Sequence, residues 1–250
     1  MAAAPSGIER PNLPSFRDWI DTRTPWNKVV DFTISLFKQT IYSTTTFYYR
    51  YHPNALPEFS QTWKEESEGL VVLVHGLRND PACWYAQLQL LRNEPAIDVF
   101  APRVLHRGLC PLAEAEEPLL AQIKDYAEKH PGKPICLLGT SNGGRLVAQL
   151  EISLREEAPS TPVKVSSVAG VILGSSRIAL IETILPLRYF YPEPLRNELR
   201  YRSERATKLL EELQAPLPEG CAERSYEFYA TTEDLLIPDL DSTLPELPGK

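Results

Sequence analysis

The sequence contains little histidine and no long apolar segment. Only four of its 250 residues are histidine, and none of them follows position 130. No apolar stretch approaches the roughly 20 residues that a membrane-spanning helix needs. The first ten residues also lack the basic start and the apolar run of a secretory signal. We therefore expect a cytoplasmic protein without a membrane-spanning helix.

Cysteine pairs and clustered basic charge are missing as well. The four cysteines lie far apart and form no C-x-x-C motif, which argues against a disulfide framework and against a metal site. The balance of 26 basic and 33 acidic residues gives a net charge of −7, with no basic stripe along the chain. Nucleic acid is therefore not an expected partner. Neither a metal nor an organic cofactor is implied.

The remaining composition is that of an ordinary folded protein, with 43% hydrophobic and 24% charged residues. Residues 1–24 are rich in proline and polar side chains and are expected to form a loose N-terminal segment ahead of the domain. Residues 25–250 are expected to form a single domain. An apolar stripe at helical spacing from Trp26 to Ile41 predicts an amphipathic helix. We favour its packing on the domain, and peripheral contact with a lipid interface stays open. The β-branched and aromatic segment 43–52 predicts a strand.

Beyond residue 68, apolar strands alternate with amphipathic helices. The predicted strands are 69–74, 97–104, 135–138, 163–173 and 225–230, and the predicted helices begin near Pro81, Pro118 and Asn142. Alternation of this kind specifies an α/β fold with a mostly parallel sheet that helices cover on both faces.

The segment 177–215 departs from this alternation. It is apolar around 178–191 and then strongly charged, which predicts a helical insertion that caps the sheet. Its arginines are interleaved with Glu193, Glu198 and Glu204. We therefore favour a solvated face of mixed charge over a phosphate-binding cluster.

The most informative stretch is Gly139-Thr140-Ser141-Asn142-Gly143. It follows four apolar residues and precedes apolar residues at helical spacing, which predicts a strand, a sharp turn and a helix. This is the pattern of a nucleophile elbow, in which the turn holds a serine in a strained backbone conformation. Side chains at Gly139 or Gly143 would crowd the neighbouring strand and helix. The pentapeptide alone is common by chance, so the flanking elements carry the argument.

Three motifs together resemble the α/β-hydrolase superfamily, in its serine lipase and esterase branch. They are His75-Gly76-Leu77 after a buried strand, the elbow at Ser141, and Asp234-Leu235-Leu236-Ile237-Pro238 after the last predicted strand. Their order is the order of the family, and the likeness spans roughly residues 69 to 240. The resemblance implies an α/β-hydrolase fold with a cap insertion at about 177–215, with the final strand and helix of that fold missing.

The resemblance also assigns roles to individual residues. Ser141 would be the nucleophile, and Asp234 the triad acid, with Glu233, Asp239 and Asp241 as nearby alternatives. The backbone N–H groups of Leu77 and Asn142 would form the oxyanion hole. His75, Gly76, Gly139 and Gly143 would shape the site without taking part in proton transfer.

The departure from the family is the histidine that should follow the acid. Of the four histidines, His130 is expected at the opposite end of the sheet from Ser141 and His52 in an early strand. His106 is expected at the carboxyl side, where we favour a surface position over one that lines the pocket. Only 16 residues follow Asp234, which favours a chain that lacks its C-terminal end over a shortened natural variant.

We therefore expect a serine hydrolase of carboxylic esters, esterase-like or lipase-like, whose activity is impaired without a triad histidine. Its substrate would be a small-molecule ester or a lipid. The alternative is a non-catalytic binding or scaffold protein with the same fold. The oligomeric state stays open.

Overall fold

The computed structural model describes Thr44, Tyr48 and residues 62–175, 178–183 and 191–229, all within the compact unit Tyr42–Lys250. The predicted lead-in, the apolar stripe from Trp26 and the motif at Asp234 lie outside these residues. Thr44 and Tyr48 are helical, so the strand predicted for 43–52 is wrong at both positions. The strand preference of β-branched and aromatic residues reflects their packing on a sheet, and a different context overrides it.

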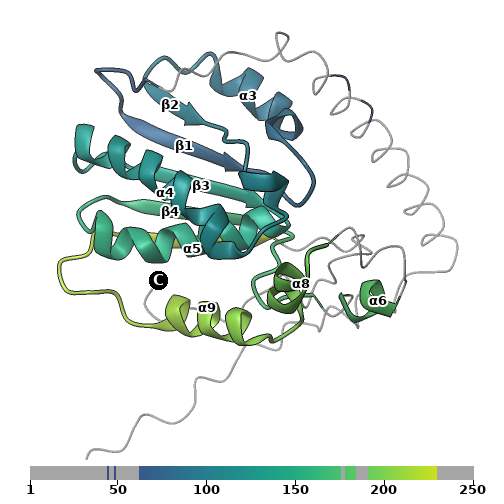
Figure 1. The fold of residues 1–250 in the computed structure, drawn as a ribbon. Coiled ribbons are helices and arrows are strands. Elements are labelled where there is room, and N and C mark those ends of the chain that lie inside the picture. Colours follow the sequence, from purple (N-terminus) through teal and green to yellow (C-terminus); the bar gives the residue numbers. More distant parts are fainter. Residues whose placement is uncertain (1–43, 45–47, 49–61, 176–177, 184–190, 230–250) are drawn as a thin grey trace, which may run out of the picture. The chain divides into compact units, whose positions relative to one another are not determined.

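Five parallel strands form one sheet in the order β2-β1-β3-β4-β5 (Figure 1). The strands are β1 Gly69–Val74, β2 Ile97–Phe100, β3 Ile135–Thr140, β4 Val163–Val168 and β5 Arg224–Tyr229. In the register, Val74 pairs with Gly139 and Gly139 with Ser167. Because every pair is parallel, the carboxyl ends of all five strands meet at one edge of the sheet, as the sequence predicts.

Eight helical segments connect or flank these strands in the described part of the chain. They are η2 Pro81–Trp84, α3 Tyr85–Leu91, η3 Leu105–Gly108, α4 Leu112–Lys129, α5 Asn142–Glu157, α6 Ile178–Thr183, α8 Glu193–Leu199 and α9 Glu204–Gln214. None of them is long and apolar enough to cross a membrane.

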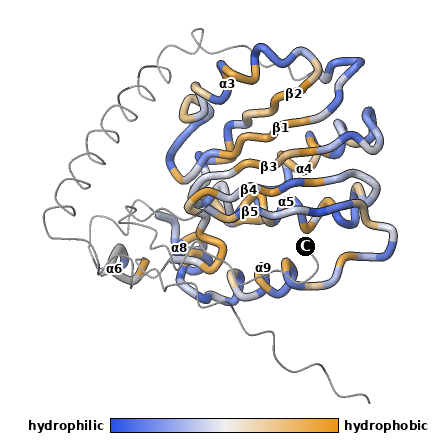
Figure 2. Tube along the Cα trace, turned by 180° about the vertical axis from the view of Figure 1, so that it is seen from behind, coloured by the Kyte–Doolittle hydropathy of each residue, from blue (hydrophilic) through white to orange (hydrophobic). Residues whose placement is uncertain are grey.

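Helices cover both faces of the sheet. Leu70 and Val72 of β1 belong to the core beneath α4 and α5, whereas Leu73 of the same strand packs with Trp84 and Leu88 of η2 and α3. Figure 2 shows the resulting hydrophobic stretches along the central strands. On the side of α5, the helix α9 packs against α5 and β5 through a cluster that contains Ala148, Leu209, Leu213 and Phe228. The helix α9 is therefore part of this helical layer.

Several predicted boundaries differ from the observed ones. The strand β2 ends at Phe100 and not at Val104, because Pro102 has no N–H to donate to a sheet. The strand β4 ends at Val168, since the next residue, Ala169, has a φ of 47° that no strand accommodates. The helix α4 begins at Leu112 and contains Pro118 in its interior, because its buried stripe extends a turn and a half earlier than predicted.

A buried group of charged side chains joins α5 to β5. The Glu151 carboxylate is fully buried and accepts hydrogen bonds from Nε and Nη2 of Arg155, at 2.9 and 2.8 Å. The Nε atom of Arg224 lies 3.2 Å from Glu151 Oε1, in a second buried ion pair. Arg155 also donates to the Tyr226 hydroxyl at 3.0 Å. One carboxylate therefore neutralises two guanidinium groups in the interior.

Candidate active site

The elbow predicted around Ser141 is present. Ser141 stands between β3 and α5 with φ 54° and ψ −126°, a backbone conformation that residues other than glycine rarely adopt. Its N–H donates to the Val168 carbonyl at 3.0 Å, and its carbonyl accepts from Gly144 at 2.9 Å. The end of β4 and the first turn of α5 therefore hold the strained backbone in place, and the side chain of Ser141 is partly exposed.

The two glycines of the pentapeptide are required by close backbone contacts. A Cβ atom at Gly139 would lie 2.2 Å from the Gly143 carbonyl oxygen, and one at Gly143 would lie 2.3 Å from the Val74 carbonyl oxygen. Gly76 approaches the serine itself, since a Cβ there would lie 2.9 Å from Cβ of Ser141. The loop after β1 therefore passes directly beside the elbow.

Leu77 and Asn142, the two expected oxyanion donors, lie near each other. Both contact the same glycine: a Cβ at Gly108 would lie 3.4 Å from Cδ2 of Leu77 and 3.6 Å from Nδ2 of Asn142. Leu77 lies in the loop that follows β1 and passes beside Ser141. Asn142 is the first residue of α5 and directly follows Ser141. The structure thus places the two predicted residues near each other, and their role toward an oxyanion stays a proposal.

His75 is buried beneath this loop with both ring nitrogens engaged. Nδ1 lies 2.8 Å from the Gly76 carbonyl, and Nε2 accepts a hydrogen bond from the Val104 N–H at 3.1 Å. These partners assign the neutral tautomer with a proton on Nδ1. Burial lowers the pKa of His75 below its usual 6.5. His75 therefore shapes the loop, and it has no free nitrogen with which to accept a proton from Ser141.

Acidic pH is expected to destabilise the fold through His75. Below pH 6.5 the unfolded chain takes up a proton at this residue while the folded chain does not, so the free energy of unfolding falls as the pH is lowered toward the depressed folded pKa. The slope is at most about 1.4 kcal/mol per pH unit. Urea unfolding between pH 7.5 and 5 measures this slope, as the change with pH in the difference between the free energies of unfolding of the wild type and of His75→Asn. A difference that does not change with pH would contradict the lowered pKa of His75.

The remaining predicted residues lie elsewhere or outside the described residues. His130 stacks on Tyr126, with ring centroids 4.7 Å apart, in the turn that precedes β3. His106 is exposed in η3, beyond the carboxyl end of β2. Asp234 and His52 fall outside the described residues. Within those residues, no histidine hydrogen-bonds the Ser141 hydroxyl.

An ion pair beside the elbow was not predicted. Arg145, one turn into α5, is 1% exposed, and its Nη2 donates to Oε2 of Glu198 in α8. The same oxygen accepts the Leu112 N–H at 3.0 Å. The expectation of a solvated charged face over this segment is therefore wrong for Glu198. It is wrong for Arg205 too, which donates to Gln149 at 2.6 Å. No sequence signal connects Arg145 to a partner 53 positions away.

An apolar cluster lies on the α8 side of the elbow. It contains Ala169 and Val171 after β4 and Leu195 and Leu199 of α8, and the partly buried Leu77 packs against it. The loop after β1 thus contributes a side chain to the core on this side of the sheet.

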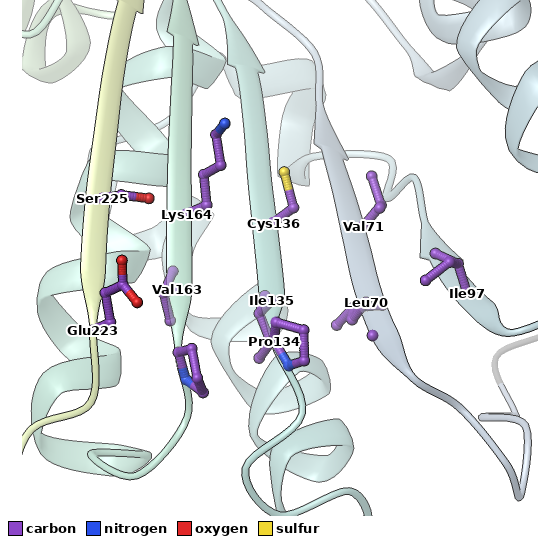
Figure 3. A pocket seen from close by; sticks show the side chains of 12 residues that line it. Leu70, Val71, Ile97, Pro134, Ile135, Cys136, Val163, Lys164, Glu223 and Ser225 are labelled. Carbon is purple, nitrogen blue, oxygen red and sulfur yellow. The ribbon is translucent and has the colours of Figure 1, made fainter.

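A separate pocket of about 330 Å³ lies at the opposite edge of the sheet (Figure 3). Its lining includes Pro134, Cys136, Lys164 and Glu223, at or near the amino ends of β3, β4 and β5. The six residues of β3 place it roughly 20 Å from Ser141. Ligands of open parallel sheets bind at the carboxyl ends of the strands, so this pocket is not the candidate site.

The fold and the elbow define an α/β-hydrolase. The model of the Alpha/beta hydrolase family matches residues 71–248, and the chain belongs to that family. A search among curated proteins gives no match.

Solved structures that resemble the chain include three with hydrolase titles. The phospholipase PlaB from Legionella pneumophila, in complex with thio-NAD, is 13% identical with a TM-score of 0.47. The similarity covers 63% of this chain and 37% of the phospholipase, so the chain spans little more than a third of that protein. A monoacylglycerol lipase from Paleococcus ferrophilus is 18% identical, with coverages of 70% and 78% and a TM-score of 0.45. An extracellular α/β-hydrolase from a Paenibacillus species is 14% identical, with coverages of 71% and 84% and a TM-score of 0.43.

Proposed function

We propose that this hydrolase acts on carboxylic esters and that Ser141 accepts the acyl group. The observation that carries the proposal is the strained backbone of Ser141 at the end of β3. Its side chain stands at the carboxyl edge of the sheet, beside the loop after β1 and the start of α5. A serine hydroxyl attacks an ester carbonyl, and the charge that develops on the carbonyl oxygen needs donors close by. The backbone N–H groups of Leu77 and Asn142 fill that role, and Asp234 is proposed as the triad acid.

The reaction would be slow, since no histidine in the described residues is bonded to Ser141. Triad enzymes that lose one member keep a rate about 10³–10⁴ times that in water, through the oxyanion hole and substrate binding. We expect acceleration of this order.

The proposal is tested with 4-nitrophenyl butyrate and decanoate. Hydrolysis above the protein-free rate is expected for both esters. Ser141→Ala should return the rate to background, whereas Ser160→Ala, an exposed serine beyond α5, should leave it unchanged. Equal rates for the wild type and Ser141→Ala would contradict the assignment of the nucleophile.

A non-catalytic binding protein is the second candidate, because no histidine among the described residues hydrogen-bonds the Ser141 hydroxyl. In that case the fold serves as a recognition surface. It predicts no turnover of either ester and full biological activity of Ser141→Ala.

A further inference from the structure

The helix α8 is linked to both segments that carry the expected oxyanion donors. Leu77, in the loop after β1, packs against the apolar cluster to which α8 contributes two leucines. Arg145, three residues after Asn142 in α5, donates through Nη2 to Oε2 of Glu198 in α8. The loop after β1 and the helix α5 are separate parts of the chain, so a shared neighbour can fix their relative position.

The Glu198 carboxylate also holds the end of the loop after β2. Its Oε2 atom accepts the Leu112 N–H at 3.0 Å, where that loop ends and α4 begins. The loop contains Gly108, where a Cβ atom would lie 3.4 Å from the side chain of Leu77 and 3.6 Å from that of Asn142. One carboxylate therefore connects α8 with α5 and with a loop that touches both candidate donors.

The carboxyl end of α8 is fixed by the segment that follows β4. The Leu199 carbonyl accepts the Ser175 N–H at 2.7 Å, and the Arg202 N–H donates to the Leu173 carbonyl at 2.8 Å. The side chain of Leu199 is buried. The helix α8 is therefore anchored independently of its ion pair with α5, and it can hold that helix in place.

The ion pair of Arg145 is poorly suited to stabilise the fold. Arg145 is 1% exposed, yet its Nε and Nη1 atoms have no hydrogen-bond partner within the residues that the structure describes. By contrast, all three nitrogens of the Arg155 guanidinium on the same helix donate hydrogen bonds, to acceptors in α5, α9 and β5. A buried ion pair repays its desolvation only when further hydrogen bonds satisfy both groups. The position that the Arg145 pair fixes explains its burial better than stability does.

We propose that Glu198 is a positioning residue for the oxyanion hole, and that its ion pair with Arg145 holds the Asn142 N–H in place relative to that of Leu77. Donors act on an oxyanion only within about 2.7–3.1 Å, and a displacement of about 1 Å can slow a reaction about 100-fold. Glu198 acts through Arg145, without contact to the reacting atoms. This inference rests on the proposed function and names residues that support the reaction at the same site.

The double variant Arg145→Met/Glu198→Gln tests the inference. It removes both charges, and the glutamine oxygen can still accept the Leu112 N–H. Replacing a whole buried ion pair by uncharged side chains is often neutral or stabilising, so the midpoint of urea unfolding should stay the same or rise. With 4-nitrophenyl butyrate, kcat should fall about 10- to 100-fold while KM stays within about twofold. An unchanged kcat, or a fall in kcat together with a lower urea midpoint, would overturn the positioning role.

Two further variants serve as rescue and control. Arg145→Lys keeps the charge, and a single donor is enough to replace the one hydrogen bond that Arg145 makes to Glu198, so kcat should stay within about threefold of the wild type. Lys124→Met/Glu157→Gln removes an exposed ion pair between α4 and the far end of α5 and should leave kcat unchanged. Equal losses of kcat in this control and in Arg145→Met/Glu198→Gln would contradict the inference.

Hydrogen exchange separates the inference from the proposed function. In Arg145→Met/Glu198→Gln, the peptides that contain Leu77 and Asn142 should exchange at least fivefold faster than in the wild type. Unchanged exchange in both peptides would overturn the inference, whether or not Ser141 reacts with an acylating probe. If both peptides exchange faster while Ser141 of the wild type is inert, the proposed function is wrong and α8 still fixes these two segments.

Discussion

Replacing Glu151 by alanine is expected to lower the free energy of unfolding by about 3–5 kcal/mol. The variant leaves the buried guanidinium groups of Arg155 and Arg224 without the carboxylate that neutralises both of them. An uncompensated buried charge of this kind costs several kcal/mol, far more than the pair itself contributes. Urea unfolding followed by circular dichroism measures the change.

The control for this variant is Glu156→Ala on the same helix. Glu156 is exposed, and a surface substitution of this type shifts stability by no more than about 0.5 kcal/mol. A loss below 1 kcal/mol for Glu151→Ala would show that the network does not support the packing of α5 on β5.

Gly143→Ala is expected to disable the elbow. The added Cβ would lie 2.3 Å from the carbonyl oxygen of Val74 and 2.7 Å from that of His75, and both are backbone atoms at the end of β1. Relief of this overlap moves the loop after β1 away from Ser141. We expect a loss of stability of about 3 kcal/mol and at least a 100-fold slower reaction of Ser141 with a fluorophosphonate in the protein that still folds.

Gly132→Ala is the control that separates the steric overlap at Gly143 from the energetic cost of a left-handed backbone conformation. Gly132 has a φ of 75° and open space where the Cβ would lie, so its substitution costs only about 1–2 kcal/mol of conformational energy. Its reaction at Ser141 should match the wild type. A Gly143→Ala protein that reacts within twofold of the wild type would contradict the close packing at the elbow.

The sheet and the elbow were predictable because their signals are local. The strand before Ser141 is apolar, and the glycines of the pentapeptide report a close backbone approach that the structure contains. The place of His75 after a buried strand was local too, whereas its role in shaping the loop was implied by the family resemblance. These features depend on residues that are neighbours in the sequence.

Features made by distant residues were not predictable. Arg145 and Glu198 are far apart in the sequence, and only the folded chain brings them together beside the elbow. The turn at His106 and Arg107 is left-handed although neither residue is a glycine, so the sequence does not indicate this conformation. We predicted a solvated charged face for the segment 193–205, because the alternation of charges does not reveal which side chains find a partner in the interior.

Mass spectrometry of the protein after reaction with a fluorophosphonate tests the central assignment most directly. The account predicts one adduct, on the peptide that contains Ser141, formed slowly and prevented by Ser141→Ala. A folded wild-type protein in which Ser141 stays unmodified, or in which the adduct forms on another residue, would contradict the assignment of Ser141 as the nucleophile.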